Sequence, residues 1–372
     1  MKPFITAIIL TAAVLSASAY ASPDISPDGK IQIALLLDTS SSMDGLIEQA
    51  KSQLWRIVNE LAAAEKNGKT PALEVALFEY GKSSIPEGES YMRMITSFTG
   101  DLDRISGELF ALSTNGGDEY CGKAIASAVR NLKWDTGNGS LKLIFIAGNE
   151  PFNQGDVNYV DAGRRAAAKG IVVNTIFCGD RETGITTYWK HGADVTGGKY
   201  INIDHNRKVM NIVAPQDAEI ARLNAELNKT YLAYGAKGKE KKMEQEIQDS
   251  NAKSLSGAIA SERAASKASA HYRNSSWDIV DAVRDKDVDL KAMKKDELPE
   301  EMKGIGVNER EEFVNKLADK REKIREKINK LNIERRAYIE KAEREQSGDD
   351  TLDTAIIKTV REQATDKKFR FR

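Results

Sequence analysis

The chain has 372 residues, of which 41% are hydrophobic and 30% charged, and its formal net charge is −1. This balance excludes the strong positive field that draws proteins to nucleic acid or to anionic lipid. The length and apolar content suffice for one sizeable core and leave many charged residues over. We therefore expect one globular domain and a separate, highly charged region.

The first residues have the pattern of an export signal. Lys2 precedes the apolar run FITAIILTAAVLSAS, and Ala19-Tyr20-Ala21 provides a small-x-small cleavage site. We expect a signal peptide over 1–21, a linker over 22–30 and a periplasmic or secreted mature protein. The alternative is an uncleaved membrane anchor, which the small residues at the end of the run disfavour. No later stretch is apolar and long enough to span a bilayer.

Residues 31–204 alternate short, β-branched apolar runs with longer segments of helical periodicity. The strand candidates are IQIALLL, ALEVALFEY, YMRMITSF, LKLIFIAG, IVVNTIFCG and KYINI. Near-continuous apolar strands are typical of a sheet covered on both faces, so we predict a doubly wound, mainly parallel six-stranded α/β domain over 31–215. In such sheets, ligands bind beyond the carboxyl ends of the strands.

Residues 216–372 lack further strand patterns and are predicted to be mostly helical. Intervals of seven separate four apolar residues of the last long segment, which predicts a partly coiled-coil region: Leu317, Ile324, Leu331 and Tyr338. Arg321 and Arg335 fall on the companion stripe and disfavour a long two-stranded coiled coil. A helical hairpin that packs on itself or on an earlier helix is the alternative. Self-association through these helices would give a homo-oligomer.

The stretch ALLLDTSSSM places Asp38, Ser40 and Ser42 at the end of the first strand. The alternate spacing brings one carboxylate and two hydroxyls to the same side of a turn, as a hard divalent cation requires of oxygen ligands. The alternative is a strand end followed by a helix N-cap, since Ser and Asp favour such positions in any protein. A five-residue pattern does not decide between the two.

This motif, the helix after it and the strand order resemble the von Willebrand factor A domain, over roughly Ile31 to Asp204. In that family the motif begins a metal ion-dependent adhesion site, to which a second loop contributes a Thr and a third loop an Asp within TDG. The resemblance implies a divalent cation, in the first instance Mg²⁺, with Mn²⁺ or Ca²⁺ as alternatives. It also implies a partner protein that presents an acidic residue to the cation.

Both further loops depart from the family pattern. Family spacing places Asp118 of NGGDEYCGKAI where the Thr stands, and Gly148 of FIAGNEPF where the Asp stands. The resemblance therefore implies a variant ligand set: Asp38, Ser40, Ser42 and Asp118, with Asn149 and Glu150 as further candidates.

Cys121 and Cys178 are the two cysteines of the chain. The resemblance places both at the ligand-binding edge of the sheet, and export would bring them to a compartment where disulfides persist. We expect a disulfide between them that braces the loop carrying Asp118. Two separate buried thiols are the alternative.

The sequence thus predicts an exported binding module without catalytic residues, which holds a protein partner through a divalent cation and carries a helical scaffold or oligomerisation region. Two alternatives stay open. One is a metal-free structural or interaction protein, and the other is an accessory subunit of an envelope complex.

Overall fold

The structure is a computed structural model that describes residues 25–89, 91–203, 211–345 and 352–371. The predicted signal peptide lies outside the described residues. The strands are β1 (Ile25–Asp38), β2 (Ala64–Glu65), β3 (Thr70–Tyr80), β4 (Met92–Thr99), β5 (Leu141–Gly148), β6 (Val172–Cys178), β7 (Tyr200–Ile203) and β8 (Arg370–Phe371). The helices are α1 (Asp44–Ala62), α2 (Leu102–Ala111), α3 (Cys121–Asn131), α4 (Tyr159–Ala168), α5 (Arg181–Thr186), α6 (Trp189–Asp194), α7 (Asp217–Asn228), α8 (Gly238–Leu255), α9 (Gly257–Ala268), α10 (Ile279–Arg284), α11 (Arg310–Glu345) and α12 (Leu352–Asp366).

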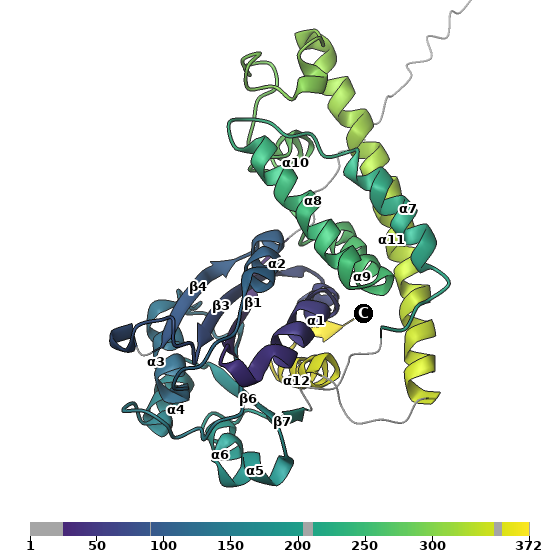
Figure 1. Ribbon diagram of the computed structural model, residues 1–372. Helices are drawn as coiled ribbons and strands as arrows, with labels where there is room; N and C mark the ends of the chain where they lie inside the picture. The colour runs from purple at the N-terminus through teal and green to yellow at the C-terminus, as the bar shows by residue number, and fades with distance from the viewer. Residues whose placement is uncertain (1–24, 90, 204–210, 346–351, 372) are drawn as a thin grey trace, which may run out of the picture.

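Six strands form one sheet in the order β4-β3-β1-β5-β6-β7. All neighbouring strands pair in parallel except β4, which runs antiparallel to β3 at the edge. The central strand β5 is buried along its whole length, because helices cover both faces of the sheet (Figure 1). The predicted doubly wound α/β architecture is confirmed.

The first strand is longer than the sequence indicated. β1 begins at Ile25, so its first residues belong to the segment 22–30 that we expected to be a linker. Ile25 and Ser26 pair with β3, and the register shifts before pairing resumes at Lys30. The segment between these pairs and Lys30 is polar and contains Pro27 and Gly29, which explains why hydrophobic patterning alone did not reveal the added pairs.

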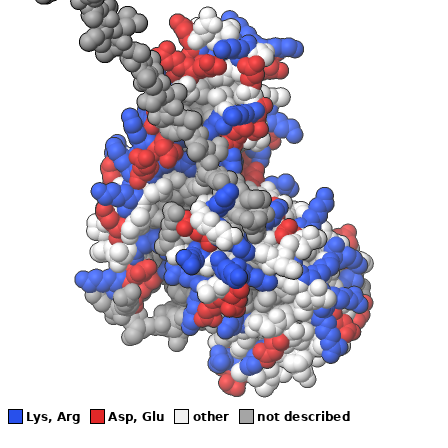
Figure 2. All heavy atoms as spheres, turned by 180° about the vertical axis from the view of Figure 1, so that it is seen from behind, with Lys and Arg blue, Asp and Glu red and all other residues white. Residues whose placement is uncertain are grey.

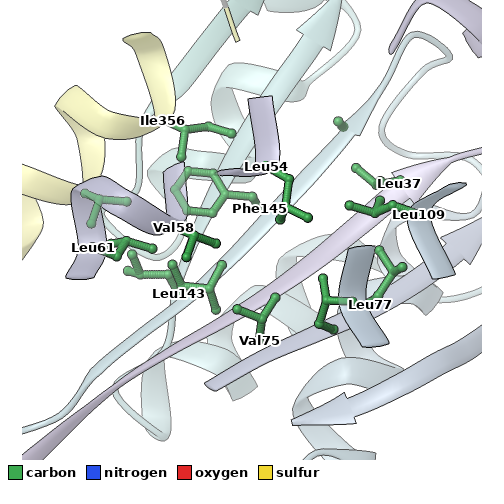
Figure 3. Close-up of a cluster of buried hydrophobic side chains, with 14 of the residues drawn as sticks. Leu37, Leu54, Val58, Leu61, Val75, Leu77, Leu109, Leu143, Phe145 and Ile356 are labelled. Atoms are coloured by element: carbon green, nitrogen blue, oxygen red, sulfur yellow. The ribbon is translucent and has the colours of Figure 1, made fainter. Parts of the chain in front are cut away.

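Alternation along the strands divides the interior into two cores. In β5, Leu143 and Phe145 face the side covered by α1 and α2, whereas Ile144 and Ile146 face α3 and α4. The first core also contains residues from the very end of the chain, among them Ile356 of α12, which lies near Phe145 in Figure 3. The last helix therefore completes the sheet domain.

This packing corrects the expected boundary at residue 215. α12 lies beside α1, and the terminal strand β8 pairs with β2, so the chain returns to the sheet domain after the helical region (Figure 1). Contacts between segments nearly three hundred residues apart have no local sequence signal. Residues 211–345 are thus an insertion between β7 and α12, and not a C-terminal extension.

Within the insertion, α11 packs along α7 and α9 of the same chain. Val314 and Ile328 of α11 are buried, whereas Tyr338 is 44% exposed. The predicted alternative to a long coiled coil, packing on an earlier helix, is the arrangement that the structure shows.

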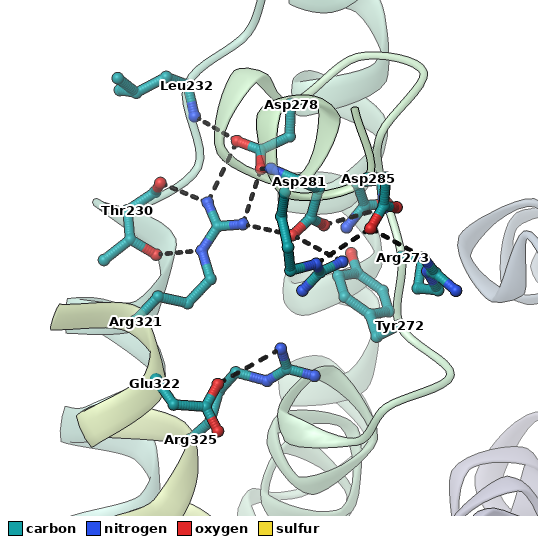
Figure 4. A network of polar contacts seen from close by, with 12 residues as sticks. Thr230, Leu232, Tyr272, Arg273, Asp278, Asp281, Asp285, Arg321, Glu322 and Arg325 are labelled. Carbon is teal, nitrogen blue, oxygen red and sulfur yellow. Dashed lines mark hydrogen bonds and ion pairs between the residues drawn. The ribbon is translucent and has the colours of Figure 1, made fainter. Parts of the chain in front are cut away.

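The hydrogen bonds of Arg321 show how α11 accommodates a buried arginine. Its guanidinium group donates to Asp278 at 2.7 Å, to Asp281 at 2.9 Å and to the Thr230 hydroxyl at 3.0 Å (Figure 4). Two carboxylates and a hydroxyl from other segments therefore satisfy a buried charge, as such a position requires.

A second buried arginine joins the insertion to the sheet domain. Arg263 of α9 pairs with Asp103 of α2 and with Asp249 of α8, each at 2.6 Å. Its guanidinium group also lies over the ring of Trp55 in α1, 4.6 Å from the centroid. The outer faces of α1 and α2 are thereby held by the insertion.

On the face shown in Figure 2, Lys and Arg side chains alternate with Asp and Glu side chains over the helical region. Among the described residues, no helix is both long and apolar enough to cross a membrane.

Candidate metal centre

The motif of the first loop lies at the carboxyl end of β1. Asp38 is fully buried, and the Ser40 amide donates to Asp38 Oδ1 at 2.7 Å. The Ser40 and Ser42 hydroxyl oxygens are 3.2 Å apart. A short 3-10 turn, Ser41–Met43, then leads into α1. The three residues that the motif predicted as ligands are brought together.

The second loop contributes Glu119 in place of Asp118. Asp118 is exposed, and it accepts a hydrogen bond from the Tyr120 hydroxyl at 3.0 Å. Glu119 is only 4% exposed, and its carboxyl group lies close enough to the Asp38 and Ser40 side chains for both to shift its pKa. The prediction that Asp118 contributes to the site is thus corrected: the residue at the site is Glu119, the next in sequence, because this irregular loop turns its side chain inward.

Two buried carboxyl groups in contact strongly affect each other's ionisation. Burial raises the pKa of Asp38. Burial and then the hydrogen bond and charge of Asp38 raise the pKa of Glu119 to about 10. Each carboxyl group thus disfavours ionisation of the other, because two adjacent buried carboxylates repel each other.

The third loop has no room for a side chain at Gly148. A Cβ atom there would lie 2.6 Å from the Tyr80 hydroxyl and 3.0 Å from Asp38 Oδ2. The Tyr80 hydroxyl donates to the Ala147 carbonyl at 2.8 Å and is fixed in this place. Tyr80, which no sequence pattern singled out, therefore explains the Gly at the family's Asp position.

Of the two residues after Gly148, Asn149 lies at the site and Glu150 lies at its edge. Asn149 Nδ2 donates to the Ser42 hydroxyl at 3.2 Å, which places the Asn149 amide at the site. Glu150 is exposed and accepts a hydrogen bond from Gln154 at 3.3 Å. Its charge contributes to the raised pKa of Asp38, so Glu150 is close to the site without being part of its buried centre.

The expected disulfide does not form, and both cysteines are free and buried. Cys178 belongs to the core on the α1 face of the sheet, whereas Cys121 belongs to the core on the α3 face. The sheet separates the two thiols. Burial raises the pKa of each thiol well above its usual value, which makes both poor nucleophiles.

The oxygen donors present fit a hard divalent cation. Asp38 Oδ2 and Glu119 Oε2 are buried and lack a hydrogen-bond donor, an unfavourable state that either a shared proton or a cation relieves. The neutral oxygens of Ser40, Ser42 and Asn149 adjoin them. Among the described residues no three His, Cys, Asp or Glu side chains form a metal-binding group, so hydroxyl and amide oxygens would have to complete the coordination.

Comparison with known proteins supports the family resemblance of the sheet domain. Residues 32–184 match the family model of the von Willebrand factor type A domain. A search of curated proteins gives no match.

Several solved structures are similar to this chain. The conserved hypothetical protein BatB of Bacteroides thetaiotaomicron is 20% identical over 47% of this chain and 90% of its own, with a TM-score of 0.36. An aerotolerance-related membrane protein of Bacteroides fragilis is 19% identical over 47% of this chain and 92% of its own, with a TM-score of 0.32. Proximal thread matrix protein 1 of the mussel byssus, described with a zinc-occupied MIDAS motif, is 13% identical over 48% of this chain and 43% of its own, with a TM-score of 0.36.

Proposed function

We propose that the protein is an exported binding module that holds an acidic residue of a partner protein through a divalent cation at this site. The observation that carries the proposal is the contact between two buried carboxyl groups, Asp38 and Glu119, with Ser40 beside them. Each carboxyl group has one oxygen, Asp38 Oδ2 and Glu119 Oε2, without a hydrogen-bond partner in the described part of the chain. A protein that buries two carboxylates together pays a desolvation cost, which a bound cation offsets.

Each residue of the site has a definite part in this proposal. Asp38 and Glu119 would supply two negative charges, which match the charge of a divalent cation. Ser40, Ser42 and Asn149 would supply neutral oxygens. Oxygen donors of this kind favour Mg²⁺, Mn²⁺ or Ca²⁺ over softer metals. The bound cation would supply an electrophilic position for a carboxylate of the partner.

The helical insertion serves in this proposal as a scaffold. It contacts α1, which follows the first site loop directly, and α2, which precedes the second. Arg263 and Asp103 hold α2 from the outside, so the insertion restrains the helices that position both loops. Self-association through the helices stays a prediction, which light scattering on the full mature chain tests.

We assign no catalytic role. In this proposal the serines of the first loop, which are hydrogen-bonded to each other and to Asn149, act as ligands and not as nucleophiles. The raised pKa of both carboxyl groups supports a second candidate, a metal-free interaction domain in which a proton held between Asp38 and Glu119 stabilises the loops.

Calorimetric titration of Mg²⁺, Mn²⁺ and Ca²⁺ into the mature chain separates the two candidates. We expect saturable binding of at least one cation, and its loss in Asp38→Ala and in Ser40→Ala. Asp161→Asn, which alters an exposed carboxylate of α4, is the matched control. Ser40→Ala keeps the buried carboxyl pair, so it remains informative if Asp38→Ala fails to fold. Cation binding by neither wild type nor control, or equal binding by all variants, would contradict the proposal.

A further inference from the structure

We infer that the partner presents its acidic residue within a basic segment, because the surface around the proposed cation site is negative. This inference rests on the proposed function and specifies the partner's chemistry. It concerns a rim formed by the four loops 39–44, 81–89, 112–120 and 148–158.

The rim contains more acidic than basic residues. These loops contain one Lys and no Arg. The one cation, Lys82, is 8% exposed and pairs at 3.3 Å with the buried Glu79. Glu79 also pairs with Arg93 of β4 at 2.5 Å, so it offsets only one of these two positive charges. Five carboxylate residues of the rim are exposed: Asp44, Glu89, Asp118, Glu150 and Asp156.

Hydrogen bonds join the four loops into one surface. The Thr114 hydroxyl donates to Asp44 and links the second loop to the first. The Ser83 hydroxyl donates to Asn115 at 3.2 Å, and Gln154 links the Glu119 amide to the Glu150 carboxylate. These bonds connect the loops that carry the rim carboxylates, and of those carboxylates Glu150 lies close enough to raise the pKa of Asp38.

Three of the rim carboxylates have neutral hydrogen-bond partners. Asp44 accepts from Thr114, Asp118 from the Tyr120 hydroxyl and Glu150 from the Gln154 amide. Such bonds hold the carboxylates in place and leave their charge uncompensated. The field over the site thus stays negative.

Charge balance then limits the partner. Asp38 and Glu119 together offset a divalent cation, so an incoming carboxylate adds a net negative charge among the rim carboxylates. A partner with Lys or Arg beside that carboxylate removes this repulsion, and one with further acidic residues increases it.

Short synthetic peptides of equal length test the inference on the full mature chain with saturating Mg²⁺. One carries a central Asp between Lys residues, a second a central Asp between Glu residues, and a third a central Asn between Lys residues. We expect the Lys-flanked Asp peptide to bind at least about fivefold more tightly than the Glu-flanked one, with the difference shrinking as salt screens the rim. We expect the Asn peptide to lose the part of the binding that depends on Mg²⁺.

Rim variants sharpen the test. The double variant Asp118→Asn, Asp156→Asn should reduce the preference for Lys flanks, whereas Glu334→Gln, on the exposed face of α11, should leave it unchanged. Equal affinities for the two Asp peptides, a preference for Glu flanks, or no binding of either peptide to cation-loaded protein would overturn the inference. Loss of the cation titration itself would instead overturn the proposed function, so the two failures are distinguishable.

Discussion

Glu119 lies against Asp38 with 4% of its surface exposed, although the two residues come from different loops and are both acidic. Neither carboxyl group has an Arg or Lys among the causes that shift its pKa. A buried acid pair of this kind destabilises a fold unless a proton or a cation occupies it. The pair is therefore the feature of the sheet domain that most needs a functional explanation.

The contact between Tyr80 and the third loop predicts a coupled effect of two substitutions. Gly148→Ala should lower the free energy of unfolding by about 1–3 kcal/mol, because its Cβ would lie 2.6 Å from the Tyr80 hydroxyl. In a Tyr80→Phe background the same change should cost less. Gly257→Ala, where no atom lies within 4 Å of the new Cβ, is the control. Chemical denaturation of the four proteins of the cycle measures the coupling, and additive costs would contradict the account.

The packing of α12 on the sheet domain predicts that a substitution in α12 destabilises strands that are far from it in sequence. Ile356 is 4% exposed in the core below α1, so Ile356→Ala should lower the stability by about 2–4 kcal/mol. Lys358→Ala alters an exposed residue of the same helix and should have little effect. Hydrogen exchange should show the loss of protection in β5 and β6 of the Ile356 variant. Unchanged exchange in these strands would show that α12 is dispensable.

The buried arginine of α11 predicts a large cost for a single truncation. Arg321→Ala leaves the buried Asp278 carboxylate without its cation and Asp281 with Arg284 alone, at 3.2 Å, which should destabilise the protein by about 3–5 kcal/mol. Arg222→Ala removes an exposed pair with Glu219 and should have little effect on stability, because solvent screens the pair. If Arg321→Ala and Arg222→Ala lowered the free energy of unfolding in urea by similar amounts, burial would add nothing to the stability of the Arg321 contacts.

His271 predicts a pH dependence of stability. Burial lowers its pKa to about 4, and its Nε2 atom has no hydrogen-bond partner. In the unfolded chain the pKa is near the ordinary value of about 6.5. The unfolded chain therefore binds a proton as the pH falls below about 6.5, whereas the folded chain does not until about pH 4, and stability decreases over that window.

Urea unfolding at pH 7.5 and pH 5 of wild type and His271→Asn measures this contribution. Wild type should lose more stability than the variant on acidification, by on the order of 1–2 kcal/mol. Equal losses would show that His271 titrates normally in the folded protein.

Part of the site and part of the fold could be predicted from local sequence patterns. Asp38, Ser40 and Ser42 follow a buried strand at alternate positions, so their convergence could be predicted. Glu119 could not be distinguished from Asp118, because an irregular loop has no fixed side-chain period. The strand alternation that places Cys178 on the α1 face of the sheet was available in the sequence and would have argued against the disulfide.

The remaining differences come from contacts between distant segments. The return of α12 to the core depends on packing of Ile356 with residues of α1 and β5, and the apolar spacing of α12 alone does not say which surface it covers. The burial of Arg321 depends on Asp278 and Asp281, which lie in another helical segment. In both cases the deciding partner is remote in sequence.

The most direct test of the account is a calorimetric Mg²⁺ titration of three proteins: wild type, Glu119→Gln and Asp118→Asn. We expect wild type and Asp118→Asn to bind with similar affinity, and Glu119→Gln to bind at least about tenfold more weakly, because only Glu119 places a carboxylate beside Asp38. Binding that survives Glu119→Gln and is lost in Asp118→Asn would contradict the central claim that the site is completed by Glu119.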